Sequence, residues 1–297
     1  MDTVTESAMA NFMQEQGGMG ILHRFCSVES HIEEFKKISD PNQVGIAIGI
    51  GEKGLERAEA LVDAGANIIC VDVAHGHSKA VNQTIRSLRE RFSDNVFIIA
   101  GNVATYAGGD YLAAAGADAI KVGIGSGSVC TTRIKTGFGV PQLTAIQDCS
   151  KVDRLVIADG GIRSAGDCVK ALAAGADLIM LGGILAATDE TPGETVTRKL
   201  EDGTEKKFKQ YRGMASKEAQ EDFMGRMADW KTAEGIAIDL PCVGSAKAVV
   251  SDLMGGIRSG LTYCGALNIK DLQRKVQFIQ MTTAGKIESS PHARNKV

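Results

Sequence analysis

The chain has 297 residues, a hydrophobic fraction of 44%, an aromatic fraction of 5% and a formal net charge of −3. This length suits one α/β barrel, which takes about 250 residues. The acidic and basic residues are interspersed along the chain, which excludes the concentrated positive charge of a protein that binds nucleic acid or anionic membranes. No apolar run approaches the roughly 18 residues of a membrane-spanning helix, and the first residues lack a signal-peptide layout. Seven scattered cysteines without metal-site spacing favour reduced thiols. We therefore expect a cytoplasmic protein with no membrane or nucleic-acid partner.

Seven short apolar segments alternate with amphipathic helical patterns. Because segments that are apolar throughout are buried on both faces, they predict a parallel sheet. The helical patterns between them include residues 56–64, 79–91 and 164–174. The predicted strands are residues 20–23, 44–50, 68–73, 96–102, 119–124, 155–159 and 178–181. They predict an α/β fold, a (β/α)₈ TIM barrel that lacks one strand.

An internal repeat supports this architecture. Residues 64–67, 115–118 and 174–177 each read Ala-Gly-Ala followed by Asn or Asp, at the end of a helical pattern. Glycine ends a helix in the left-handed conformation, and the apolar run that follows is a buried strand. The spacings of 51 residues (64 to 115) and 59 residues (115 to 174) each accommodate two strand–helix units.

The loop after the fifth predicted strand is the most informative motif. Residues 123–133 read Gly-Ile-Gly-Ser-Gly-Ser-Val-Cys-Thr-Thr-Arg. The glycines allow positive φ and let the backbone approach a ligand closely. Positive charge on Arg133 and free backbone N–H groups would favour the thiolate of Cys130. A reactive cysteine and a buried, inert one both remain open from this loop alone.

Glycine-rich or polar segments also follow other predicted strands, at residues 73–76, 101–103, 159–161 and 182–183. Barrel enzymes build their sites at the carboxyl ends of the strands, so we expect the site there. Residues 186–239 break the strand–helix pattern and predict a lid or flap insertion within a single domain of residues 1–297. This segment contains a predicted hairpin at residues 197–210, and helical patterning returns at 246–254.

These motifs resemble those of the IMP dehydrogenase and GMP reductase family and follow the family's order. They are residues 1–5 (Met-Asp-Thr-Val-Thr), the cysteine loop, and residues 158–162, 180–183, 211–214 and 255–259. The resemblance implies a barrel, usually in a homotetramer, whose cysteine attacks C2 of a purine nucleotide while hydride moves between C2 and a nicotinamide cofactor. It also implies that most of the first barrel strand is missing and that no CBS regulatory domain is present.

Within this family we favour GMP reductase, which would convert GMP to IMP and ammonia with NADPH. Residues 135–143 are similar to the reductase loop, the lid between Met214 and Glu234 lacks the dehydrogenase's Arg-Tyr pair, and no regulatory insertion lies at residues 38–44. The tail, residues 283–292, is instead similar to the dehydrogenase. The alternatives are an NAD-dependent IMP dehydrogenase and a non-catalytic nucleotide-binding remnant.

The resemblance also implies roles for individual residues. Cys130 would be the nucleophile, with Thr132 and Glu234 as a proton relay. The substrate would contact Met1, Ser128, Asp159, Gly160, Gly161, Gly182, Gly183, Tyr211, Gly213, Met214, Ala215, Lys231 and Gly235. The cofactor would contact Arg24, Asp72, Val73, Ala74, Ile124, Gly125, Gly256, Arg258 and Ser259. A K⁺ site would use Gly125, Gly127, Cys130 and Arg133.

Overall fold

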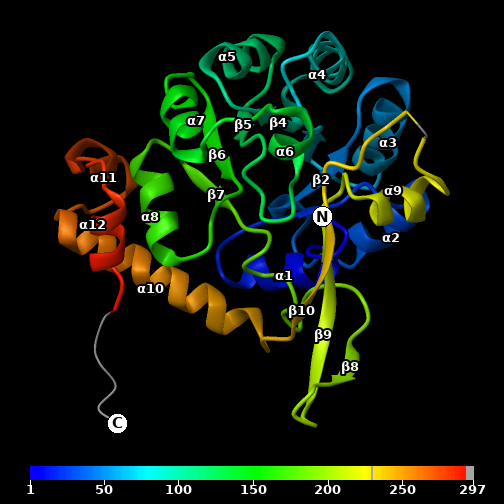
Figure 1. Ribbon diagram of the computed structural model, residues 1–297. Coiled ribbons are helices and arrows are strands. Elements are labelled where there is room, and N and C mark those ends of the chain that lie inside the picture. Colours follow the sequence, from blue (N-terminus) through cyan, green and yellow to red (C-terminus); the bar gives the residue numbers. More distant parts are fainter. Residues whose placement is uncertain (229, 292–297) are drawn as a thin grey trace.

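The computed structural model describes residues 1–228 and 230–291, and its centre is a parallel sheet of seven strands (Figure 1). The strands pair in sequence order, and within the described residues the two end strands have one neighbour each. They are β1 (Gly20–Leu22), β2 (Val44–Ile48), β3 (Ile68–Asp72), β4 (Phe97–Val103), β5 (Ala119–Val122), β6 (Leu155–Asp159) and β7 (Leu178–Met180). The sheet curls as a barrel does, so the predicted TIM-barrel type of fold, one strand short, is confirmed.

Helices follow the strands and cover the outer face of the sheet (Figure 1). They are α2 (Val28–Lys36), α3 (Gly51–Asp63), α4 (Lys79–Phe92), α5 (Tyr106–Ala115), α7 (Gln142–Cys149) and α8 (Ala165–Ala173), with 3₁₀ turns at Pro41–Gln43 and Ser93–Asn95. Four of these helices begin with a side-chain hydroxyl that accepts a backbone N–H of the first turn, from Ser27, Ser78, Thr105 and Ser164. The apolar faces of helices and strands together form the main core.

The repeated Ala-Gly-Ala-Asp motif does more than end a helix. The carboxylate of Asp118 accepts the N–H of Ile98 at 2.7 Å, and that of Asp177 accepts the N–H of Val156 at 2.9 Å. Each aspartate also donates its own backbone N–H to the carbonyl of the same strand residue. The motif therefore ties β5 to β4 and β7 to β6, which fixes the register of the barrel.

Helix α1 (Ser7–Glu15) precedes β1 and packs directly on it. A Cβ added to Gly20 would lie 2.6 Å from the Cβ of Ala10, so only glycine allows this close approach. A second apolar cluster joins α1 to the cysteine loop, the lid and the C-terminal helix, through Val4, Met9, Val129, Leu185, Tyr211 and Val250.

The predicted lid segment, residues 186–239, contains an antiparallel sheet of three strands. β8 (Val196–Lys199) and β9 (Glu205–Arg212) form the predicted hairpin, which projects below the barrel in Figure 1. β10 (Ala237–Pro241) pairs with the other edge of β9. The sequence did not predict β10, because the strand is short and ends in a proline. Helix α9 (Lys217–Met224) lies between β9 and β10 in the chain.

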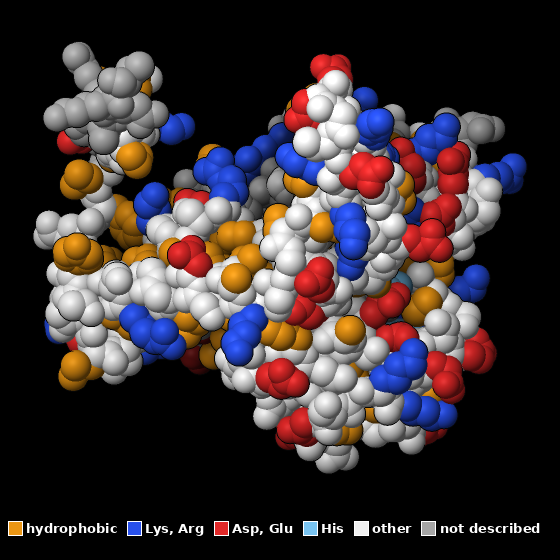
Figure 2. Space-filling view, turned by 90° about the horizontal axis from the view of Figure 1, so that it is seen from below, with side chains coloured by type: hydrophobic (Ala, Val, Ile, Leu, Met, Phe, Trp, Pro, Cys, Tyr) orange, Lys and Arg blue, Asp and Glu red, His pale blue; other side chains and the backbone are white. Residues whose placement is uncertain are grey.

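The C-terminal helix α10 (Ala246–Cys264) is longer than the helix predicted at residues 246–254, which was expected to end before two glycines. The helix continues through them, and Gly256 and Gly260 let it approach Ala165 and Val169 of α8 closely. Two short helices follow, α11 (Ile269–Lys275) and α12 (Thr283–Glu288). None of the helices in the described part of the chain is long and apolar enough to cross a membrane. Figure 2 shows acidic and basic side chains interspersed on the face seen from below, with hydrophobic side chains gathered on its left side.

Gly256→Ala should lower the free energy of unfolding by about 1–3 kcal/mol, because its Cβ would lie 2.2 Å from the Cβ of Ala165 and force α8 and α10 apart. Gly255→Ala is the matched control, since no atom lies within 4 Å of its added Cβ. Helix propensity alone should make this control about 1 kcal/mol more stable than the unmodified chain. Urea unfolding followed by circular dichroism measures both, and equal shifts would contradict the close packing.

Candidate functional site

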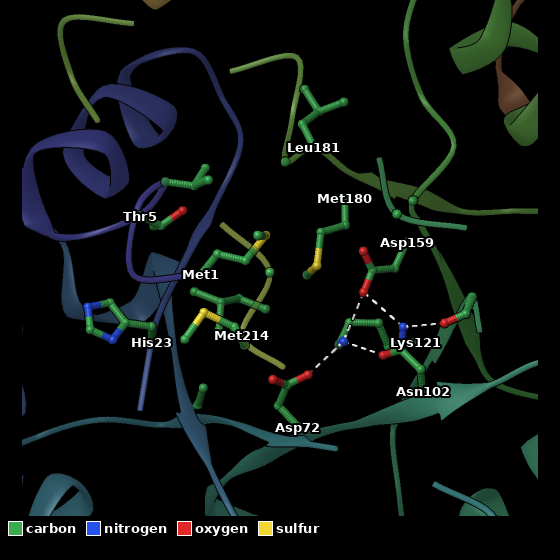
Figure 3. A pocket seen from close by; sticks show the side chains of 18 of the residues that line it. Met1, Thr5, His23, Asp72, Asn102, Lys121, Asp159, Met180, Leu181 and Met214 are labelled. Atoms are coloured by element: carbon green, nitrogen blue, oxygen red, sulfur yellow. Dashed lines mark hydrogen bonds and ion pairs between the residues drawn. The ribbon is translucent and has the colours of Figure 1, made fainter. Parts of the chain in front are cut away.

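A cavity of about 460 Å³ opens at the carboxyl ends of the strands and gathers most of the predicted site residues. Figure 3 shows that Met1, Met180 and Met214 lie together in it, beside a polar group from the strand ends. The predicted residues that line it are Met1, Arg24, Asp72, Val73, Ala74, Ile124, Gly125, Gly127, Cys130, Thr132, Asp159, Gly160, Gly182, Tyr211, Gly213, Met214, Ala215 and Glu234.

A thiol, a hydroxyl and a carboxylate form a chain of hydrogen bonds in this cavity. The Sγ–H of Cys130 donates to Oγ1 of Thr132 at 3.2 Å, and Thr132 Oγ1–H donates to Oε2 of Glu234 at 2.8 Å. Thr132 begins the short helix α6 (Thr132–Thr136), while Glu234 comes from the lid. The arrangement can carry a proton between the cysteine and the carboxylate.

The lid reaches the cysteine loop through backbone pairing. The N–H of Thr131 donates to the carbonyl of Glu234 at 2.8 Å, and the N–H of Ile236 donates to that of Val129 at 3.0 Å. Cys130 and Gly235 are therefore partners in an antiparallel bridge. The side chain of Glu234 is directed to Thr132 by this pairing.

A second group of predicted residues lies around Tyr211. Its hydroxyl hydrogen-bonds Ser128 Oγ at 3.1 Å, and burial raises the pKa of Tyr211 above its usual value. A Cβ on Gly183 would lie 2.6 Å from Ser128 Oγ, so glycine keeps this corner open. Gly160 and Gly161 have φ values of 95° and 81° and begin the turn after β6. These backbone N–H groups can bind an anion.

A buried ion-pair cluster lies at the strand ends, and the sequence analysis missed its central residue. Lys121 is 4% exposed, and its Nζ donates to Asp72 Oδ1 at 2.8 Å, to Asp159 Oδ2 at 2.9 Å and to Asn102 Oδ1 (Figure 3). Burial alone would lower the pKa of Lys121, but the charges of Asp159 and Asp72 outweigh burial and raise it. The signal in the sequence is a lysine inside an apolar strand, Ala-Ile-Lys-Val.

Arg24 borders the same cavity on the side of Asp72. Its guanidinium lies 5.0 Å from the ring centre of Phe25, and its buried Nε has no hydrogen-bond partner. Burial lowers the pKa of Arg24, against the attraction of Asp72. An unpartnered buried donor at the edge of a cavity can bind a polar ligand group.

Nine predicted residues do not line the cavity. Five of them, Ser128, Arg133, Gly161, Gly183 and Gly235, belong to segments that border it. The other four lie in the lid or in α10. Lys231 is exposed, and its Nζ lies 5.3 Å from the ring centre of Trp230. Gly256, Arg258 and Ser259 lie in the middle of α10, where Gly256 contacts α8. The structure therefore gives them no direct place beside a ligand in this cavity.

The cysteine loop fits a cation only in part. Within the described residues, the carbonyls of Gly125 and Cys130 accept no hydrogen bond, while that of Gly127 accepts the Cys130 N–H at 3.1 Å. Arg133 does not fit, because its carbonyl accepts the N–H of Gly137 and its guanidinium donates to the loop carbonyl of Ile124. No group of three His, Cys, Asp or Glu side chains suited to a metal ion occurs in the part of the chain that the structure describes.

Comparison with known proteins gives a consistent result. The sequence profile of the IMP dehydrogenase / GMP reductase domain matches residues 1–292. An inosine-5'-monophosphate dehydrogenase of Nitrosopumilus maritimus is 45% identical over 266 residues, and one of Aquifex aeolicus is 49% identical over 260. Both matches cover 84% of this chain but 54% and 52% of the relatives, so the chain spans about half their length. The crystal structure of an inosine 5' monophosphate dehydrogenase from Legionella pneumophila is 57% identical with a TM-score of 0.85, covering 96% of this chain and 86% of that one.

The preference for GMP reductase is wrong, because these relatives and the solved structure are named IMP dehydrogenase. NADPH was predicted as the cofactor of GMP reductase, so that prediction loses its basis as well. The grounds for the reductase were the loop at residues 135–143, the lid between Met214 and Glu234, and the lack of an insertion at residues 38–44. Phe138 in that loop is 76% exposed, and exposed loops change sequence at little cost in packing. The tail, which pointed to the dehydrogenase, contains α12, and its residue 292 lies outside the described residues.

We expect iodoacetamide at pH 8 to label Cys130 and to spare Cys70, Cys149 and Cys168. Burial raises the pKa of Cys70 and Cys149 to about 12 and that of Cys168 to about 11, so at most about one of these thiols in a thousand is ionised. Cys130 is only partly buried and borders the cavity. Peptide mapping by mass spectrometry measures the labelling, with Cys130→Ser as the control. Faster labelling of a buried cysteine would contradict this prediction.

Proposed function

We propose that this chain, which belongs to the IMP dehydrogenase / GMP reductase domain family, oxidises inosine monophosphate (IMP) at C2 of the purine to xanthosine monophosphate. The observation that carries the proposal is the contact of the Cys130 thiol, the Thr132 hydroxyl and the Glu234 carboxylate in one cavity. The names of the relatives supply the substrate class. The chain would thus be an oxidoreductase that acts through a covalent thioimidate.

The first half of the reaction forms a bond between Sγ of Cys130 and C2 of IMP. The thiol proton passes through Thr132 to Glu234, and the partly exposed carboxylate releases it to water. C2 would then lose its hydrogen as hydride, for which NAD would supply the acceptor. The product of this half is a thioimidate on Cys130.

The second half is hydrolysis of the thioimidate. Thr132 takes a proton from water and passes its own to Glu234, so that the oxygen of water bonds to C2. The C–S bond breaks, and the Cys130 sulfur recovers a proton. The reaction then balances as IMP, NAD and water giving xanthosine monophosphate, NADH and one proton.

The cavity offers separate places for the parts of IMP. The phosphate would bind backbone N–H groups of Gly160, Gly161, Gly182 and Gly183, beside the Ser128 and Tyr211 hydroxyls. The purine would lie against Met1, Met214 and Ala215, which line the cavity near Cys130. A Cβ on Gly213 would lie 3.4 Å from the Cα of Gly235, and one on Gly235 would lie 3.3 Å from the Cα of Gly213, so glycine at both positions keeps this part of the lid close to the loop.

NAD would bind on the side of Arg24 and Asp72, next to Val73, Ala74, Ile124 and Gly125. The buried, unpartnered Nε of Arg24 supports this placement, because it is a free donor for a polar group of the cofactor. The free carbonyls of Gly125 and Cys130 support K⁺ binding by the loop, with Gly127 as a further ligand. The chain would form a homotetramer, the family's usual assembly, in which the exposed side chains of Tyr263 and Leu267 would be available for contacts between chains.

The purified chain should reduce NAD when IMP is added, and Cys130→Ala should abolish this turnover while changing IMP affinity less than about threefold. NADH absorbance and calorimetric titration with IMP measure the two properties. Binding of IMP without turnover by the unmodified chain would instead favour a non-catalytic nucleotide-binding protein. Turnover by Cys130→Ala would refute the role of the thiol.

Glu234→Gln should slow hydrolysis by about 100-fold or more, and slow the first half less. Water is a far weaker acid than a thiol, so its attack depends more on the carboxylate. We therefore expect a burst of one NADH per chain, and a nucleotide adduct on Cys130 by mass spectrometry. Glu218→Gln, an exposed lid carboxylate, is the control and should retain normal turnover. Loss of the burst would show that the first half depends on Glu234 as much as hydrolysis does, and would contradict the prediction.

A further inference from the structure

We propose that Lys121 is a positioning residue whose single ammonium holds the two carboxylates that receive the two nucleotides, Asp159 on the IMP side and Asp72 on the NAD side. This inference rests on the proposed function and deepens it. The three side chains come from separate strands, β5, β6 and β3, and meet at one end of the cavity (Figure 3).

The ammonium of Lys121 has no hydrogen left for a ligand. It has three N–H donors, and these are used by Asp72, Asp159 and Asn102. The lysine therefore acts on bound molecules only through the side chains that it holds. This distinguishes it from a residue that contacts substrate.

Each carboxylate keeps one oxygen free for a ligand. Within the described residues, Lys121 and Asn102 donate to Oδ2 of Asp159, while its Oδ1 has no partner. Only Oδ1 of Asp72 is bonded, by Lys121. The side chains of Asp72 and Asp159 are 37% and 27% exposed, and both border the cavity. A free carboxylate oxygen accepts hydrogen bonds from ribose hydroxyls, which IMP and NAD both carry.

Asn102 extends the cluster to the nucleophile loop. Its Nδ2 donates to Oδ2 of Asp159 at 3.0 Å and to the carbonyl of Gly123 at 2.7 Å. Gly123 is the first residue of the loop that carries Cys130. One cluster thus connects both proposed nucleotide contacts to the start of the catalytic loop.

The charge balance shows what removal of the lysine would do. Two carboxylates face one ammonium, so a neutral residue at position 121 would leave two negative groups close together in a partly buried place. Such groups repel, and one of them takes up a proton or moves away. Lys121 also holds the pKa of Asp72 below its usual value, against the effect of burial. Both carboxylates should therefore lose their position together.

The test is calorimetric titration of the chain with IMP and with NAD separately. Lys121→Gln should weaken both affinities by about 10- to 100-fold. Asp159→Asn should weaken IMP alone and Asp72→Asn should weaken NAD alone, while Lys121→Arg should recover most of both affinities. If Lys121 served only stability, Asp159→Asn and Asp72→Asn would not each weaken the binding of a different ligand.

Arg89→Gln is the matched control, because Arg89 is also a largely buried cation but donates to carbonyls of Ser93, Val96 and Gly116, which precede β4 and β5 at the ends opposite the cavity. It should lower stability and leave both affinities within about threefold. Should Lys121→Gln fail to fold, the Lys121→Met/Asp72→Asn pair keeps the net charge of the cluster. This double variant should bind IMP about 10-fold more weakly than Asp72→Asn alone.

Loss of affinity for only one ligand in Lys121→Gln, or equal IMP affinity in Asp72→Asn and the double variant, would overturn the shared role and leave the proposed function intact. Failure of the unmodified chain to bind IMP or NAD would refute the proposed function, and this inference with it. The two failures are therefore distinguishable by the unmodified chain.

Discussion

The short backbone pairing between the lid and the cysteine loop turns two distant segments into one site. Thr132 and Glu234 are 102 residues apart, and the bridge between Cys130 and Gly235 sets their side chains against each other. Successive side chains of an extended segment point to opposite faces, so a shift of one residue would turn Glu234 away from Thr132. Gly213 supports the pairing, because a Cβ there would lie 3.3 Å from the carbonyl oxygen of Val129 and 3.4 Å from the Cα of Gly235.

The lid has a fixed base and a loosely held tip. At the base, the ammonium of Lys209 in β9 is bonded to three carbonyls of the segment that follows β7. At the tip, α9 buries only Ala219, and the Phe223 ring contacts the Phe25 ring at 5.0 Å. Segments with few buried contacts open at low free-energy cost, so the tip can move while the base stays in place. Glu234 lies outside this tip, because its backbone is bonded to Thr131 of the cysteine loop and to Ala215.

Most of the barrel could be predicted from the sequence because its signals are local. Apolar strands, Ser and Thr caps and the Ala-Gly-Ala repeat each depend on neighbours in the chain. The errors concern elements whose existence or length depends on contacts between segments far apart in the chain. β10 forms because β9 offers an edge, and α10 continues through Gly255 and Gly256 because α8 packs against it. The branch of the family was also misjudged, since it was inferred from an exposed loop, from the lack of an Arg-Tyr pair in the lid and from the lack of an insertion at residues 38–44.

The cluster around Lys121 could have been inferred from the strand register, starting from the lysine inside the apolar strand Ala-Ile-Lys-Val. In the sheet, Lys121 pairs with Gly101, and Gly101 pairs with Asp72, so the lysine and this carboxylate lie at the same level. On the other side Lys121 pairs with Ile157, and Asp159 points to the same face two residues later. A lysine in a buried strand needs an opposite charge, and these are the carboxylates within its reach. Parallel pairing in sequence order is therefore sufficient to bring the charge and its partners together at the strand ends, where the cavity opens.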